Sequence, residues 1–299
     1  MDVALLMVAG GVAAGLFGSL LGLGGGLLIV PLLTILFGLP LREAVGVSLV
    51  CVIVTSSASA GVFLQRRQAN LRLGMTLELF TAMGAIAGGL IAFQLDSRAL
   101  AGLFALVLLY VAFTMARGVR APKPVAARRD ADAGFDEDAD AAADADTERD
   151  AHDAARAGGG APLSTIAAAI SDPGHTYHNL PGGLVGSVGA GVVSALLGIG
   201  GGIVKVPVMH LVMGVPLRVA TATSNLMIGI TASASAIVYL IRGGIDVNAA
   251  APTTIGVFIG ATVGSRVAGR VDLRLLRGLF VAVLVFTAWE MAQRAITGP

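Results

Sequence analysis

The segment LLGLGGGLLIVP at residues 20–31 returns as LLGIGGGIVKVP at residues 196–207. The offset of 176 residues holds without a gap beyond the phrase, and residues 18–50 and 194–226 share 14 identities in 33 positions. Shared apolar composition alone does not produce so many matches. Two apolar halves, each with a glycine cluster that interrupts a helix, are typical of membrane proteins whose site lies between two repeats.

The composition is that of an integral membrane protein. Of the 299 residues, 56% are hydrophobic and 13% are charged, and the mean hydropathy is +0.84. A soluble core does not need such a large apolar share. The alternation of apolar and polar residues that marks a membrane β-strand is absent. The predicted fold class is therefore an all-α, polytopic helical bundle.

Apolar windows of about 20 residues, long enough to cross a bilayer, recur along both halves. They are residues 2–22, 43–64, 74–94, 99–117, 182–202, 219–241, 248–268 and 275–294, and the shorter stretches 26–38 and 202–214 follow the glycine clusters. We therefore expect about eight long membrane helices plus two short glycine-broken or re-entrant segments. The N-terminus has no basic region, so a cleaved signal peptide is not expected.

Residues 118–178 interrupt the apolar pattern and divide the chain into a first membrane repeat, 1–117, and a second, 179–299. The segment 118–160 alone holds 11 of the 19 acidic residues and is rich in alanine, aspartate and glycine. Such a segment cannot bury enough apolar surface to fold. We predict a disordered linker that acts as a solvated spacer, with a regulatory or partner-binding tail as the alternative.

Arginine positions predict the orientation of the helices. In the first half they gather in one loop and at the start of the linker, which places both on the cytoplasmic side: Arg66, Arg67, Arg72, Arg117, Arg120, Arg128 and Arg129. In the second half they gather one loop later, at Arg266, Arg270, Arg274 and Arg277. This swap predicts inverted repeats, which need an odd number of crossings per half. A simple four-plus-four count would make the repeats parallel.

The glycine clusters are the first candidate site. Three successive glycines weaken a helix by roughly 1 kcal/mol each, and open backbone within a membrane is tolerated only where it is buried in protein or lines a cavity. We expect a helix break whose free N–H groups bind an anion, with close helix packing as the alternative. The predicted substrate-binding glycines are Gly24, Gly25, Gly26, Gly200, Gly201 and Gly202.

Polar residues near the clusters extend the candidate site. Lys205 is the one lysine in the apolar part of the chain, and its counterpart in the first copy is Ile29. An ionisable residue within a membrane segment is a functional candidate, although a lysine near the surface can also snorkel to water. Ser48, its counterpart Ser224, and the neighbouring Asn225 are further predicted substrate contacts.

Other charged residues are weaker candidates. Arg42 and Arg218 occur in both copies and are better explained as anchors of helix ends than as attractors of anions. Glu78 and Glu290 are placed near the ends of their spans, so no carboxylate is expected in the middle of the membrane. A proton relay through acids is therefore not visible, and both facilitated diffusion and coupling through a group such as His210 are left open.

Together these motifs resemble the sulfite exporter TauE/SafE family, also called the TSUP family of anion transporters. The resemblance covers both membrane halves and rests on GLGGG at 22–26 with Pro31, its copy at 198–202 with Pro207, PLREAVGVS at 40–48, PLRVATATSN at 216–225 and RGGID at 242–246. It implies a multi-pass plasma-membrane protein that moves small sulfur-containing anions such as sulfite, sulfonates or related carboxylates.

The sequence thus predicts a transporter of sulfite, organosulfonates or related sulfur-containing anions, working by alternating access between two repeats. An anion-selective channel and a carrier of small carboxylates are the alternatives. An enzyme is not expected, because the four histidines lack metal-ligand spacing, and no metal or cofactor is expected either. The expected partners are a small anionic substrate and the lipid bilayer, with homo-oligomerisation left open and nucleic acid excluded.

Overall fold

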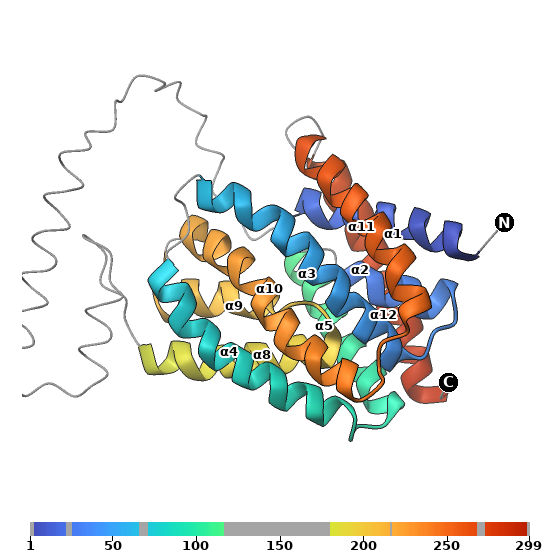
Figure 1. Ribbon diagram of the computed structural model, residues 1–299, viewed down its shortest axis with the longest axis horizontal. Helices are drawn as coiled ribbons and strands as arrows, with labels where there is room; N and C mark the ends of the chain where they lie inside the picture. Colours follow the sequence, from blue (N-terminus) through green and yellow to red (C-terminus); the bar gives the residue numbers. More distant parts are fainter. Residues whose placement is uncertain are drawn as a thin grey trace, which may run out of the picture.

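The computed structural model describes residues 3–21, 26–65, 71–116, 180–215, 217–267 and 273–297. Every regular element in these ranges is a helix (Figure 1). The predicted linker 118–178 and the glycines Gly24 and Gly25 lie outside them. The expected all-helical class is confirmed for the described part of the chain.

The helices fall into two groups with matching bounds. The first group is α1 (Val3–Leu21), α2 (Gly26–Pro31) with its π-helical continuation η1 (Leu32–Leu36), α3 (Leu41–Gln65), α4 (Leu71–Ala92) and α5 (Ser97–Ala116). The second is α8 (Leu180–Leu197), α9 (Gly202–Pro207) with η2 (Val208–Val212), α10 (Leu217–Ile241), α11 (Val247–Val267) and α12 (Leu273–Thr297). The bounds of α2 and α9, and of α3 and α10, are offset by the same 176 residues as the sequence phrases.

Several of these helices are membrane-spanning by length and composition. Within the described residues, five reach the required length and apolar character, namely parts of α4, α5, α8, α10 and α11. Shorter apolar helices at Val3–Ser19, Gly26–Leu36 and Gly202–Val212 accompany them. The chain is thus a polytopic helical membrane protein.

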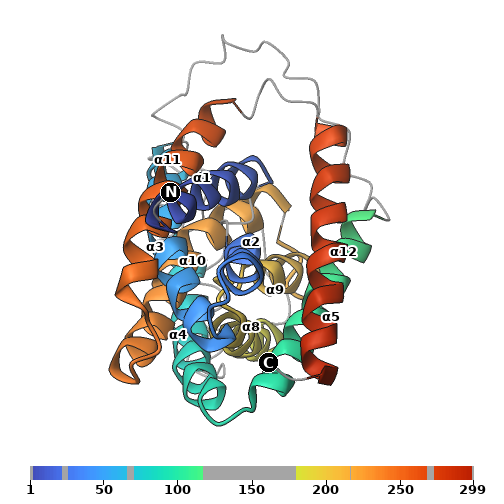
Figure 2. The ribbon, with the colours of Figure 1, turned by 90° about the vertical axis from the view of Figure 1, so that its right-hand side faces the viewer.

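The main helix pairs each join a helix of the first group to a helix of the second. α1 lies along α11 and α4 along α8, whereas α3 contacts α10 and α5 contacts α12; Figure 2 shows α5 beside α12. In two matched pairs, α3 with α10 and α5 with α12, the helices run in opposite directions. Gly102, early in α5, faces Ala295 at the end of α12, and Gly46, early in α3, faces Gly244 just beyond α10.

Glycines let the crossed helices approach backbone to backbone. A Cβ added at Gly84 of α4 would overlap the carbonyl oxygen of Val188 on α8. A Cβ added at Gly260 of α11 would overlap the carbonyl oxygen of Val12 on α1. Small residues are the usual means of close helix approach in membranes. The two contacts are equivalent. Gly84 and Gly260 are 176 residues apart, and so are Val12 and Val188.

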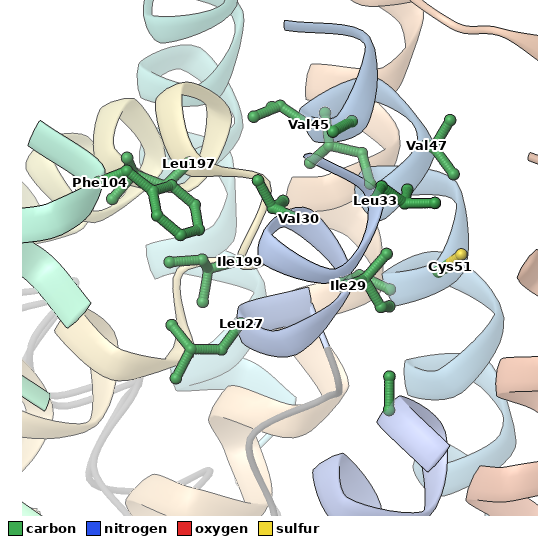
Figure 3. Packing of buried hydrophobic residues seen from close by; sticks show 14 of the residues in the cluster. Leu27, Ile29, Val30, Leu33, Val45, Val47, Cys51, Phe104, Leu197 and Ile199 are labelled. Atoms are coloured by element: carbon green, nitrogen blue, oxygen red, sulfur yellow. The ribbon is translucent and has the colours of Figure 1, made fainter. Parts of the chain in front are cut away.

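The broken helices occupy the middle of the bundle, where α2 and α9 are surrounded by the longer helices (Figure 2). The apolar core gathers around α2, with Leu27, Ile29, Val30 and Leu33 fully buried (Figure 3). Proline lacks a backbone N–H, and Pro31 and Pro207 are the points where α2 and α9 pass into the wider π-helical turns. A proline followed by a π-helical turn is therefore present in both halves.

Candidate functional site

The chain leaves helical geometry between α8 and α9. Gly198, Gly200 and Gly201 have φ of +68°, +81° and +77°, a region that side chains other than glycine rarely adopt. The predicted helix break is thus confirmed in the second copy, and it places Gly200–Gly202 in the middle of the bundle. In the first copy only Gly26 is described, as the first residue of α2.

Two serine hydroxyls face this break. Ser194 of α8 and Ser224 of α10 are buried, and within the described residues neither hydroxyl has a hydrogen-bond partner. A Cβ added at Gly201 would lie 3.2 Å from the Cβ of Ser194, and one added at Gly202 would lie 3.5 Å from the Ser224 hydroxyl. Buried polar groups are normally hydrogen-bonded, so these two hydroxyls are available to a ligand.

Ser48, the counterpart of Ser224, has a different environment. Its hydroxyl lies 2.7 Å from the carbonyl oxygen of Gly198 and 3.2 Å from that of Gly26. A hydroxyl has one proton to donate, and that of Ser48 is directed at the backbone. Ser48 therefore links the start of α2 to the break before α9, whereas Ser224 has no such role.

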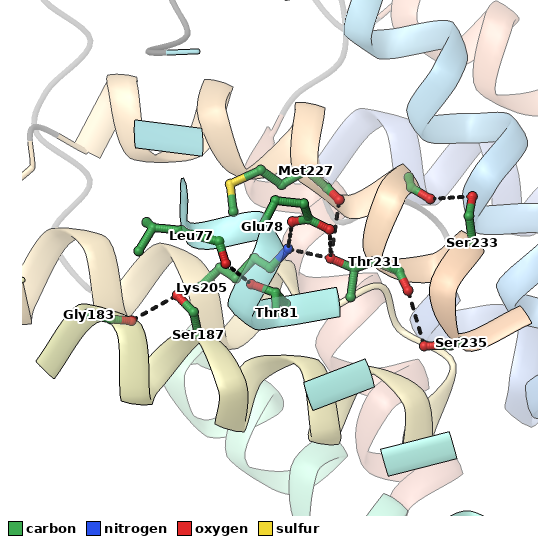
Figure 4. Close-up of polar contacts among 11 residues, drawn as sticks. Leu77, Glu78, Thr81, Gly183, Ser187, Lys205, Met227, Thr231, Ser233 and Ser235 are labelled. Carbon is green, nitrogen blue, oxygen red and sulfur yellow. Dashed lines mark hydrogen bonds and ion pairs between the residues drawn. The ribbon is translucent and has the colours of Figure 1, made fainter. Parts of the chain in front are cut away.

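Lys205 lies on α9, one turn beyond the break, and its ammonium group is enclosed by protein (Figure 4). Its Nζ donates to Oε2 of Glu78 on α4 at 2.8 Å and to Oγ1 of Thr231 on α10 at 2.5 Å. Oγ1 of Thr231 in turn lies 2.6 Å from Oε1 of Glu78. Three helices thus contribute to one buried, closed polar cluster.

Glu78 is not among the site residues predicted from the sequence. Its position near the end of an apolar window gave no sign of a role, and no acid was expected in the middle of the membrane. In the structure Glu78 is 4% exposed and is paired with Lys205, 127 positions away in the chain. Breaking a buried pair by removing one partner costs about 3–5 kcal/mol. The signal available in the sequence was that one lysine and one glutamate, each alone in an apolar segment, need counter-ions.

The remaining predicted residues have varied surroundings. Asn225 is buried next to Ser224 in α10. Arg42 donates from Nη2 to the carbonyl oxygen of Leu95 at 2.9 Å and stacks over Phe93 at 5.3 Å. His210 is exposed, and its Nδ1 lies 2.9 Å from the Val215 carbonyl oxygen.

The described ranges bring no three His, Cys, Asp or Glu side chains together as a metal site. The site instead consists of a non-helical glycine segment packed inside the bundle, the two unpartnered hydroxyls of Ser194 and Ser224, and a neighbouring ammonium–carboxylate pair. Hydroxyl and ammonium groups donate hydrogen bonds. The arrangement is therefore suited to holding a small acceptor-rich ligand inside a membrane protein.

The helical architecture with a central broken segment defines a polytopic membrane protein with an internal polar site. The family model "Sulfite exporter TauE/SafE" matches residues 7–291. The chain therefore belongs to the TauE/SafE family and is a membrane transporter, as the sequence predicted.

Two relatives illustrate the match. The probable membrane transporter protein YunE of Bacillus subtilis is 22% identical over 298 residues, covering 97% of this chain and 98% of YunE. A probable membrane transporter protein of Methanocaldococcus jannaschii is 32% identical over 118 residues, covering 38% of this chain and 44% of that protein. No solved structure matches the chain.

Proposed function

We propose that this protein carries small anions, namely sulfite, organosulfonates or related sulfur-containing anions, across the plasma membrane by alternating access between its two halves. The substrate is held at the break between α8 and α9. The observation that carries this proposal is the pair of buried, unpartnered hydroxyls of Ser194 and Ser224, which flank Gly200–Gly202.

The chemistry of the break favours an oxyanion. Sulfite, sulfonate and carboxylate oxygens accept hydrogen bonds, so their site must supply donors. The two hydroxyls supply one proton each, and backbone N–H groups in left-handed turns form concave anion sites. The glycines are needed because Gly201 adopts φ +77° and because a Cβ at this position would lie 3.2 Å from both the Ala190 carbonyl oxygen and the Cβ of Ser194.

Lys205 gives the site its preference for negative charge. Uncharged hydroxyls bind oxygen acceptors of any charge, whereas an ammonium group one helical turn away favours anions. Gly202 and Lys205 are both residues of α9, and Ser224 and Thr231 lie two turns apart on one face of α10. The donor pair and the charged pair therefore belong to the same two helices.

We further propose that residues 1–117 and 179–299 are inverted repeats, joined by a cytoplasmic spacer at 118–178. The antiparallel pairing of α3 with α10 and of α5 with α12 supports this arrangement, as do the equivalent contacts of Gly84 and Gly260. A two-fold axis perpendicular to the helices relates such halves and lies in the membrane plane. Alternating access then consists of one half moving against the other around the broken segments.

Counterflow in liposomes tests the proposal. Purified protein is reconstituted with sulfite inside, and uptake of labelled sulfite, sulfoacetate, thiosulfate and small carboxylates is measured. A carrier gives saturable counterflow, whereas a channel gives none. Ser194→Ala and Ser224→Ala are expected to raise the KM for the transported anion about tenfold each, because each loses one hydrogen bond to a charged group, worth about 1.5 kcal/mol.

Matched controls come from the same helices. The Ser187 hydroxyl of α8 donates to the Gly183 carbonyl oxygen at 2.8 Å, and that of Ser235 in α10 to the Thr231 carbonyl oxygen at 3.2 Å. Ser187→Ala and Ser235→Ala should leave the KM unchanged. Unchanged KM in both Ser194→Ala and Ser224→Ala would remove the site assignment, and absence of counterflow for every anion would remove the function.

A further inference from the structure

Resting on this proposed function, we propose that Glu78 is a built-in counter-ion that occupies Lys205 until a proton releases it, so that the protein moves one proton with each monovalent anion. The observation is the closed cluster of Glu78, Lys205 and Thr231 beside the substrate site (Figure 4). In this state the ammonium group is neutralised by protein and cannot attract an anion.

The fold does not need this charge pair. At the equivalent place around α2, Ile29 takes the position of Lys205 and Thr254 of α11 that of Glu78, and Ile29 is fully buried in the apolar core. The same backbone thus forms around an uncharged set of side chains. A buried ion pair is often no more stable than well-packed apolar residues, so its presence beside α9 and not beside α2 points to transport rather than folding.

Protonation of Glu78 lowers the electrostatic cost of binding an anion beside Lys205. If an anion approached Lys205 while Glu78 stayed ionised, two negative charges would share one ammonium group in a medium that solvates charge poorly. A proton taken up by the Glu78 carboxylate removes one of these charges. The hydrogen bond between Lys205 and the carboxylate then weakens, and the ammonium group is free to pair with the anion.

The cycle balances in protons and charge. From one side of the membrane a proton adds to the Glu78 carboxylate, and an anion A⁻ enters and pairs with Lys205. After the halves reorient, A⁻ leaves to the other side and the proton dissociates from Glu78. The ion pair of Glu78 and Lys205 then forms again. One proton and one A⁻ have crossed, and no net charge has moved.

Few other ionisable groups can take this role. α4 packs against α8 and α10 and lies beside α9, and α8 has no ionisable side chain. The side chains of Arg72 on α4 and Arg218 on α10 lie outside the described set. The described ionisable groups of α10, α9 and η2, apart from Lys205, are bonded to backbone carbonyls away from Glu78: Tyr239 to Ala195 and His210 to Val215.

The test measures proton and anion movement together in liposomes that contain the full chain. Labelled methanesulfonate replaces sulfite here, because sulfite itself takes up a proton near neutral pH whereas a sulfonate stays monovalent. Its uptake and the internal pH are recorded with the membrane potential fixed, with and without an acidic outside. Wild-type protein is expected to take up methanesulfonate at least tenfold faster with the acidic outside, and to acidify the lumen as the anion enters. In Glu78→Gln, Lys205 has no counter-ion, so uptake should no longer respond to the pH gradient and the KM for methanesulfonate should no longer depend on pH.

A buried threonine on the same helix is the matched control. The Thr81 hydroxyl donates to the Leu77 carbonyl oxygen at 2.8 Å, and Thr81→Ala should keep the full proton response. If Glu78→Gln does not fold, Glu78→Asp replaces it; this variant keeps a carboxyl group and should keep proton uptake, with the infrared band of the protonated carboxyl shifted from its wild-type position.

The outcomes separate the two proposals. Net uptake of methanesulfonate by the wild-type protein without proton uptake would overturn the role of Glu78 and leave the proposed function intact. The role of Glu78 would also be overturned if Glu78→Gln keeps a wild-type response to the pH gradient, or if the infrared band of the protonated carboxyl does not shift in Glu78→Asp. Absence of counterflow for every anion in the panel would overturn the proposed function, and this inference with it.

Discussion

The surroundings of α2 and of α9 are two versions of one structure. Both helices follow a glycine cluster, end at a proline and continue as a π-helical turn. Around α2 the space is filled by Ile29 and other apolar side chains (Figure 3). Around α9 the equivalent space holds Lys205 paired with Glu78 (Figure 4). The difference teaches that the same glycine and proline pattern sets the same backbone around different side chains, apolar beside α2 and charged beside α9, which is where we propose that the substrate binds.

A second difference concerns the matched serines. Ser48 donates its proton to the backbone at the break, so it holds the two broken segments together. Ser224 occupies the equivalent position and has no partner within the described chain. One copy of the residue therefore stabilises the bundle, and the other is the one that we propose to bind substrate.

The largest expected effect comes from making the second region resemble the first. Lys205→Ile alone leaves the Glu78 carboxylate buried without a counter-ion, and we expect the free energy of unfolding to fall by about 3–5 kcal/mol. The double variant Lys205→Ile/Glu78→Thr copies the surroundings of α2 and should recover most of that loss, whereas transport should be absent. Thermal unfolding in detergent, followed by circular dichroism, measures the stability.

The outcome that would contradict this comparison is specific. If the double variant is as unstable as Lys205→Ile, the two regions are not interchangeable, and the ion pair has a structural role. If the double variant transports sulfite at the wild-type rate, the charge is not part of the site.

A smaller effect is expected at the break itself. Gly201→Ala forces a Cβ into a left-handed conformation, which costs roughly 1–2 kcal/mol, and places it 3.2 Å from the Cβ of Ser194. We expect a loss of stability of this size together with loss of sulfite counterflow. Gly189→Ala is the control, because Gly189 lies within α8 with no neighbour within 4 Å of an added Cβ. It should gain up to about 1 kcal/mol in stability and keep transport.

The smallest effect separates the two serines. Ser48→Ala loses a buried hydrogen bond and should lower the free energy of unfolding by about 1 kcal/mol. Ser224→Ala removes a hydroxyl that has no partner, so its stability should equal or slightly exceed that of the wild type. The same thermal unfolding assay compares them, and equal destabilisation by both substitutions would show that Ser224 is also bonded within the protein.

Much of the architecture could be predicted from sequence because it follows from local rules. The apolar window 43–64 corresponds to α3, Leu41–Gln65, and the window 219–241 to α10, Leu217–Ile241. The break before α9 followed from successive glycines, whose lack of a Cβ permits the left-handed conformation. The site was harder to predict. Lys205 was predicted because it is isolated among apolar residues. Glu78 was assigned to the end of a span. Ser194 was not predicted, because a serine is common in a membrane helix.

The sequence by itself determined the membrane class and the position of the helix break before α9, because hydrophobic length and glycine conformation depend on neighbouring residues alone. Only the tertiary structure decided which polar groups meet. The pairing of Glu78 with Lys205 depends on how α4 packs against the helices around α9. The contrast between Ser48 and Ser224 likewise depends on which carbonyl oxygens the other half brings within reach.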